Sequence, residues 1–227
     1  MDAVAHGTPA VVSVDAWRRS RGGYDGRASG AGVIVHPDGY VVTNSHVVQG
    51  GERLTVSLFG GKARYDARIV QDDPSGDLAI LKIQRPGGFP HVSLSTSWSL
   101  MLGESAIAVG NPHGLGDTVT VGVISAIGRG AKMQTGVTLR DLVQTDASIN
   151  IGNSGGALLN LDGELIGIIV SLLPSAKGIA FAIPADHVAS LLKRSVGKSA
   201  PPNALPEPLE PTPSPSAPSP PETTSPR

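Results

Sequence analysis

The chain has 227 residues, of which 40% are hydrophobic and only 4% aromatic, so it can bury a core built mainly from aliphatic side chains. Its formal net charge is −1, with 18 basic and 19 acidic residues and no basic run, which gives no reason to expect binding to nucleic acid or to a membrane surface. It has no cysteine and therefore no disulfide, and no apolar stretch is long enough to span a bilayer.

The first segment, residues 1–9, does not place a basic region before an apolar one. A secretory signal needs both, so the sequence as it stands predicts no export and a cytoplasmic location by default.

Residues 10–183 read as an all-β region. The 29 glycines and the many turn signals favour short strands over long helices, and the length fits one large all-β domain or two small barrels that share a cleft. A link at residues 85–90, rich in proline and glycine, divides the region in two. The strands expected before the link are Ala10–Val14, Gly30–His36, Gly39–Thr43, Leu54–Leu58, Arg64–Gln71 and Leu78–Ile83. Those expected after it are Ser105–Val109, Thr118–Ile127, Leu142–Thr145, Ala157–Leu159, Glu164–Val170 and Gly178–Ala182.

The chain then predicts one helix and a tail. Apolar residues at Val188, Leu191 and Leu192 recur with helical period and indicate a helix over about 185–195. Residues 198–227 are mostly Pro, Ser, Thr and Glu, a composition that cannot form a packed core, so we expect an extended or disordered tail. Its Pro-x-x-Pro spacings would suit an SH3-like partner, but a solvated tail is the favoured interpretation.

The strongest chemical signal is the run Gly152-Asn153-Ser154-Gly155-Gly156. A nucleophilic serine needs an exposed tight turn with backbone N–H groups aimed at an incoming oxyanion, and flanking glycines let the substrate approach closely. Taken alone, such a run is also typical of a flexible turn.

Two further residues supply what a nucleophilic serine lacks. His46 ends the β-branched run Val41–Thr43 and can act as a general base near neutral pH, while Asp77 stands before an alternating apolar strand and can orient that base. The competing interpretation of His46 is a strand cap, and the competing carboxylates are Asp72 and Asp73, which precede a proline and read as turn residues.

The order His46, Asp77, Ser154 and the surrounding motifs resemble the chymotrypsin-like serine proteases, and more closely the HtrA/DegP family. The resemblance covers about residues 10–195. Its motifs are Thr43-Asn44-Ser45-His46-Val47-Val48, Asp77-Leu78-Ala79-Ile80-Leu81-Lys82, Ala108-Val109-Gly110-Asn111-Pro112, Thr118–Ala126, Gln144–Gly156 and Gly178-Ile179-Ala180-Phe181-Ala182-Ile183-Pro184.

The resemblance implies a protease domain over residues 10–197, made of two six-stranded antiparallel β-barrels at about 10–84 and 91–183. It also implies an oxyanion hole from the backbone N–H groups of Gly152, Asn153 and Ser154. The position six residues before the nucleophile, where trypsin-like enzymes carry a carboxylate, holds Ser148. With Ile168, Ile169 and Val170 beside it, we expect a shallow apolar pocket for small aliphatic side chains.

The resemblance also bears on regulation. Asn153 carries no charge for the ion pair by which digestive relatives activate, so we expect switching by loop rearrangement, with candidate loops at 110–117, 130–139, 149–153 and 171–178. Ile151 and His113 depart from the family pattern in those loops, and no PDZ domain follows the helix in this sequence. The family implies a periplasmic or exported location and a homotrimer, for which the short N-terminal segment gives only weak support.

The sequence therefore predicts a serine endopeptidase that acts on unfolded or misfolded proteins and needs no metal or organic cofactor, since no cluster has ligand spacing. The alternative is a chaperone-like or scaffold protein that holds peptides in the cleft between the barrels with little cleavage.

Overall fold

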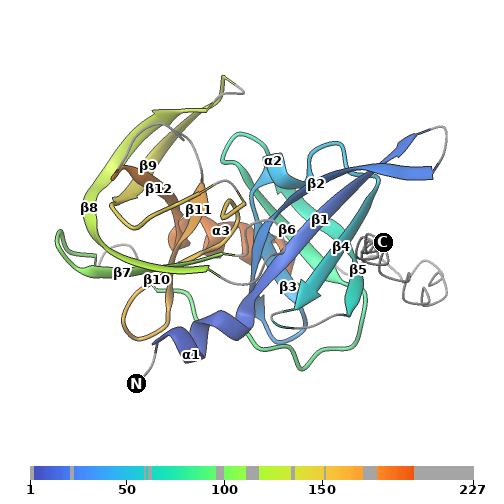
Figure 1. The fold of residues 1–227 in the computed structure, drawn as a ribbon, viewed down its shortest axis with the longest axis horizontal. Helices are drawn as coiled ribbons and strands as arrows, with labels where there is room; N and C mark the ends of the chain where they lie inside the picture. The colour runs from blue at the N-terminus through green and yellow to red at the C-terminus, as the bar shows by residue number, and fades with distance from the viewer. Residues whose placement is uncertain are drawn as a thin grey trace, which may run out of the picture.

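The structure is a computed structural model, and it describes residues 3–196 except 21–22, 59, 61–62, 96–99, 111–117, 134–135, 151 and 171–177. Two closed antiparallel barrels lie side by side (Figure 1). The expected fold class is therefore confirmed.

The first barrel follows the order β1-β2-β3-β6-β5-β4 around its circumference. Every neighbouring pair is antiparallel. β-branched side chains such as Val14, Ile34 and Val42 are fully buried. Its strands are β1 (Val11–Ser20), β2 (Gly23–His36), β3 (Tyr40–Thr43), β4 (Arg53–Leu58), β5 (Arg64–Asp73) and β6 (Leu78–Ile83).

The second barrel follows the order β10-β11-β12-β9-β8-β7. Its three strands β10, β11 and β12 are buried at every position, so they read in the sequence as continuous apolar runs. The strands are β7 (Ser105–Gly110), β8 (Thr118–Lys132), β9 (Thr138–Thr145), β10 (Ala157–Leu159), β11 (Leu165–Val170) and β12 (Ala180–Pro184).

The β1–β2 hairpin is longer than the sequence predicts, and Figure 1 shows it running beyond its barrel. The apolar alternation fails at Asp15, where the expected strand stopped. Asp15 is nevertheless buried, because it accepts a hydrogen bond from the Ser29 hydroxyl and lies 3.7 Å from the Arg27 guanidinium across the hairpin. Tertiary partners for a buried charge cannot be read from a local pattern.

Short helices were also missed. α1 (Ala3–Gly7) and the 3₁₀ turn η1 (Thr8–Ala10) precede the first strand, and α2 (Ser45–Val48) follows β3. Gly7 lies against the Leu159 side chain of the second barrel so closely that a Cβ would clash with it. The N-terminal segment thus reaches the second barrel before the chain enters the first.

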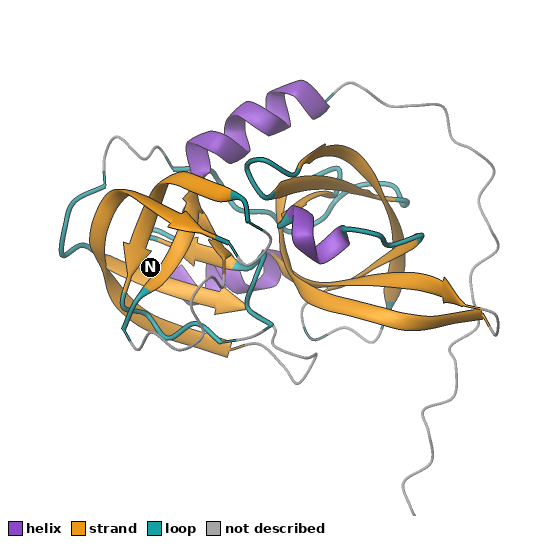
Figure 2. Cartoon of the chain, turned by 90° about the horizontal axis from the view of Figure 1, so that it is seen from above, coloured by secondary structure: helices purple, strands orange, loops and turns teal. Residues whose placement is uncertain are grey.

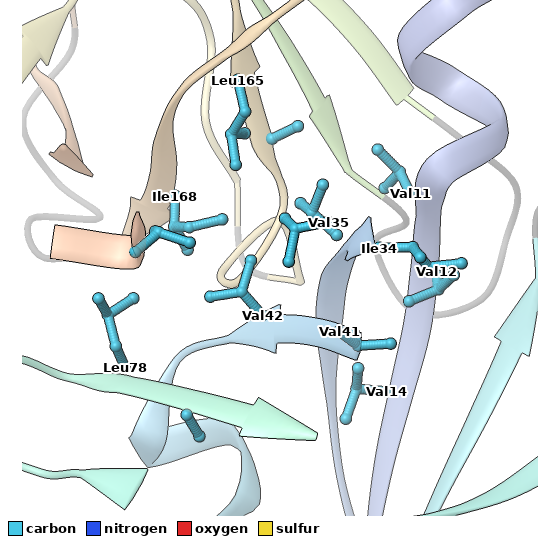
Figure 3. Packing of buried hydrophobic residues seen from close by; sticks show 14 of the residues in the cluster. Val11, Val12, Val14, Ile34, Val35, Val41, Val42, Leu78, Leu165 and Ile168 are labelled. Carbon is cyan, nitrogen blue, oxygen red and sulfur yellow. The ribbon is translucent and has the colours of Figure 1, made fainter. Parts of the chain in front are cut away.

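The two barrels share one buried layer. A single hydrophobic cluster takes in strands of both. Figure 3 shows Val35 lying between Val42, which is also in the first barrel, and Leu165 of the second barrel. A separate cluster fills the second barrel and includes Leu158, Ile166 and Ile169. Because the interface is continuous with the core, residues at its edge are held in fixed positions.

The closing helix, α3 (Ala185–Ser195), lies where the sequence predicts it. It buries Ala185, Val188 and Leu191 and contacts β5 and β6 of the first barrel as well as β11 and β12 of the second (Figure 2). No helix in the described residues has the length and apolar character needed to cross a membrane.

Candidate active site

The structure brings His46 and Asp77 together at one end of the first barrel. His46 lies in α2, directly after β3, and Asp77 directly precedes β6, and these two strands pair with Thr43 opposite Ala79. The imidazole Nδ1 is 2.9 Å from Oδ2 and 3.0 Å from Oδ1 of Asp77, and the His46 backbone N–H donates to Oδ1 at 3.0 Å. The antiparallel pairing of β3 with β6 therefore creates the contact.

This contact fixes which nitrogen of the ring carries the proton. A carboxylate only accepts hydrogen bonds, so Nδ1 must donate, and in the neutral ring Nε2 is then the acceptor. The Asp77 side chain is only 3% exposed, whereas that of His46 is 32% exposed. The arrangement is a buried anion that holds a solvent-accessible imidazole in the tautomer a general base requires.

Asp77 itself is held in a left-handed backbone conformation, with φ of 51°. The Asn44 side chain, fully buried, donates from Nδ2 to the Asp77 carbonyl oxygen at 3.1 Å. Asn44 was not assigned a role from the sequence, although it lies in the same motif as His46. The signal for it is a polar residue at the end of a buried strand, which must have a partner.

Ser154 reaches the first barrel through its backbone. The Ala31 N–H on β2 donates to the Ser154 carbonyl oxygen at 2.8 Å, and the Thr43 hydroxyl donates to the Ala31 carbonyl at 2.7 Å. Thr43 is the last residue of β3, so this relay ties the serine turn to the strand that leads to His46.

Two glycines, Gly30 and Gly155, allow the serine turn to lie close to the first barrel. A Cβ on Gly30 would lie 3.0 Å from the Ser154 carbonyl oxygen and 2.8 Å from the Val47 side chain, next to His46. Gly155 has φ of 85°, and a Cβ there would clash with the Ala31 carbonyl and the Thr43 hydroxyl. The structure thus brings the serine turn, α2 and the end of β3 to one place.

Backbone hydrogen bonds within the turn that carries Ser154 stabilise it. The Asn153 N–H donates to the Asn150 carbonyl at 3.1 Å, and the Gly156 N–H donates to the Asn153 carbonyl at 2.9 Å. The Asn153 N–H, expected to help form the oxyanion hole, is used inside this turn. Gly152, with φ of 100°, adopts a conformation open chiefly to glycine.

The residues expected to line the specificity pocket lie around the same turn. Ser148 is exposed, and its carbonyl accepts a hydrogen bond from the Thr120 hydroxyl of β8 at 2.9 Å. Ile168, Ile169 and Val170 are all buried on β11. Ile149, which the sequence did not predict as a pocket residue, packs against the hydrophobic cluster inside the second barrel.

Several expectations fall on residues outside those that the structure describes. They are the centres of the candidate switching loops (111–117, 134–135 and 171–177), the departures at His113 and Ile151, and the whole of the 198–227 tail with its proline motif.

Comparisons with known proteins identify the family to which this fold belongs. Residues 30–168 match the family model of the trypsin-like peptidase domain. The chain is 44% identical over 173 residues to the periplasmic serine endoprotease DegP of Escherichia coli K12, covering 74% of this chain and 36% of that protein. It is 43% identical over 205 residues to the serine protease HTRA1A of Danio rerio, covering 88% and 42%.

A solved structure described as the HtrA-type protease AlgW with tripeptide superposes with a TM-score of 0.75 and 38% identity, covering 86% of this chain and 62% of that one. The chain spans about two fifths or less of the length of DegP and HTRA1A. The chain belongs to the trypsin-like peptidase family, and its paired barrels are of the HtrA/DegP type.

Proposed function

We propose that this chain is a serine endopeptidase whose nucleophile, general base and orienting carboxylate are Ser154, His46 and Asp77. The observation that carries the proposal is the bond from His46 Nδ1 to the buried Asp77 carboxylate, which leaves Nε2 as a proton acceptor. The relatives DegP and DegQ are named serine endoproteases, which supports the same activity here.

The proposed reaction uses these three residues in two steps. Nε2 of His46 accepts the proton of the Ser154 hydroxyl as its oxygen attacks the peptide carbonyl, and Asp77 stabilises the imidazolium that forms. His46 then gives that proton to the leaving amine, an acyl-enzyme remains on Ser154, and water activated by the same imidazole releases the product.

The negative oxygen of the tetrahedral intermediate needs donors that are already in place. We assign the backbone N–H groups of Gly152 and Ser154 to this task, because the Asn153 N–H serves the turn that presents them. These donors belong to the backbone, so a change of loop conformation, not of a side chain, would remove them.

Substrates are proposed to be unfolded segments with small aliphatic side chains before the cleaved bond. No carboxylate stands at position 148 to pair with a lysine or arginine. The strand β11, which hydrogen-bonds to the serine turn through Ile169, carries only aliphatic side chains from Ile168 to Val170. A hydrophobic pocket discriminates between aliphatic side chains by only about 1–3 kcal/mol for each methylene group, so we expect a preference and not strict selection.

Incubation of the protein with unfolded casein, beside the variant Ser154→Ala, tests the activity. A fluorophosphonate probe should label Ser154 in the wild type and not in the variant. Mass spectrometry of the casein fragments should show cuts mainly after Val, Ala or Leu.

Labelling without cleavage would show an activated serine that lacks an organised substrate site. Loss of both across pH and temperature would instead support the chaperone-like alternative, in which the cleft holds peptides without cutting them.

A further inference from the structure

A cavity of about 340 Å³ lies on the α3 side of the molecule, where both barrels meet that helix. Its wall comes from the turn between β5 and β6 (Asp73 to Leu78), from the start of β9 (Thr138 to Leu142), and from one face of α3. The helix contributes His187, Ser190 and Arg194, which are spaced so as to share a face. Nothing in the proposed reaction uses this cavity.

The cavity has an apolar floor and a cationic rim. Leu78, Leu139, Leu142 and Ile183 form the floor and are all buried. The titratable groups that line it are Asp73, Arg140, His187 and Arg194. The guanidinium of Arg140 is exposed and makes no ion pair or hydrogen bond to any other residue that the structure describes.

The one carboxylate in the wall is already engaged. Asp73 Oδ1 accepts from the Ser75 hydroxyl at 2.6 Å and from the Gly76 N–H at 3.2 Å. Arg140 therefore keeps its donors for an outside anion. Arg194 lies close enough to Asp73 to act on its charge and donates from Nε to the Ser190 carbonyl at 3.2 Å, so only its terminal nitrogens are left for such an anion. Guanidinium groups bind carboxylates in a bidentate manner. An aliphatic floor beside such donors suits a peptide that alternates leucine with glutamate.

This chain contains such a segment. Residues 205–210 read Leu-Pro-Glu-Pro-Leu-Glu, and Leu205 and Leu209 are the only large aliphatic residues after Val196. The linking residues 197–204 span up to about 27 Å when extended. Arg194 lines the cavity only two residues before Val196, so a tether of this length gives an effective concentration on the order of millimolar.

We propose that residues 205–210 dock in this cavity, with Leu205 and Leu209 on the apolar floor and Glu207 and Glu210 on Arg140 and Arg194. The prolines between them limit the conformational entropy lost on docking. The wall contains the turn from Asp73 to Gly76, which leads directly into Asp77. If the proposed function holds, docking also stabilises the carboxylate that orients His46.

The absence of cysteine allows a direct test in the full chain. A nitroxide attached through Thr212→Cys should broaden the methyl NMR signals of Leu139 and Ile183, whereas one at Thr224→Cys should broaden them much less. Arg140→Glu should reduce the broadening, and Arg140→Glu together with Arg194→Glu should abolish it. Adding Glu207→Lys and Glu210→Lys to that double variant should restore it, because both ion pairs are then reversed. The matched controls are Arg129→Glu, an exposed arginine on the neighbouring strand outside the cavity, and Glu222→Lys in the tail.

Broadening that is absent, or that survives Arg140→Glu unchanged, would overturn the docking. A free peptide with the sequence of residues 204–212 provides a second test. If it bound the wild-type chain as tightly as it binds the Glu207→Lys, Glu210→Lys variant, the cavity would be vacant in the wild type and the docking would be overturned. None of these readouts needs proteolysis, so a failure of the proposed activity leaves the docking test intact. Where proteolysis is found, the Glu207→Lys, Glu210→Lys variant should cleave casein at least twofold more slowly than the wild type.

Discussion

The amide of Ala31, in the first barrel, donates a 2.8 Å hydrogen bond to the carbonyl oxygen of Ser154, in the second. This bond fixes the serine turn against the strand that neighbours β3, and β3 leads to His46. Alignment of the proposed nucleophile and base therefore depends on backbone contacts between the barrels as much as on the side chains themselves.

Gly155→Ala should disrupt this junction. The new Cβ would meet the Ala31 carbonyl and the Thr43 hydroxyl, and φ of 85° is unfavourable for alanine. We expect a lower melting temperature and the loss of casein cleavage and probe labelling. Gly130→Ala is the control, since its nearest neighbour would be 3.7 Å from the added carbon, and it should change neither.

Asp77→Asn should leave the fold in place and lower turnover by about four orders of magnitude, the loss known for this arrangement of residues. The reason is that an amide in place of the carboxylate no longer holds Nδ1 as a donor. The rate of fluorophosphonate labelling measures the effect, with Asp72→Asn, near the end of β5, as the control. A loss smaller than tenfold would mean that another group orients His46.

Asn44→Ala should loosen the backbone that positions Asp77. It removes the 3.1 Å hydrogen bond to the Asp77 carbonyl, and a buried group left unsatisfied costs about 1–3 kcal/mol. We expect a lower free energy of unfolding in urea together with a lower kcat and a little-changed KM. If kcat stays at the wild-type value in the folded fraction, Asn44 is only a structural residue.

Ser148→Asp tests the specificity pocket. A carboxylate at this position should attract basic side chains, so cleavage of casein after lysine and arginine should rise relative to cleavage after valine. Gln84→Asp, at an exposed position directly after β6 and outside both the site and the α3 cavity, controls for the added charge. Fragment patterns that do not differ between Ser148→Asp and wild type would place the pocket elsewhere.

Stability should depend on Asp73 at acid pH. The hydrogen bond from Ser75 is the main cause that holds the pKa of Asp73 below its usual range, aided by the Gly76 amide and Arg194 and opposed by burial. Because the folded pKa lies below the unfolded value of about 3.9, this carboxylate stabilises the fold above that pH, and the contribution is lost as pH falls through the folded pKa.

Ser75→Ala should therefore lower the free energy of unfolding at pH 7, and its difference from wild type should vanish at strongly acid pH. Urea titrations at pH 7, 4 and 2.5 measure this, with Asp72→Asn for comparison. A difference that persists at the lowest pH would mean that the serine acts through packing instead of through the carboxylate.

The strand pattern and the closing helix could be predicted from the sequence, which is also the source of the three residues proposed for the reaction. Periodicity of apolar residues and glycine-rich turns are local properties, and the motifs around His46, Asp77 and Ser154 are contiguous. Short helices such as α2 were not predicted. The full length of the β1–β2 hairpin was not predicted either, because Asp15 breaks the apolar pattern yet has partners across the hairpin.

Which groups come into contact could not be predicted from the sequence. The bond from Asn44 to the Asp77 carbonyl, the relay from Thr43 through Ala31 to Ser154, and the cavity between α3 and both barrels join residues far apart in the chain. Such contacts depend on strand order and barrel closure, and no local pattern encodes them.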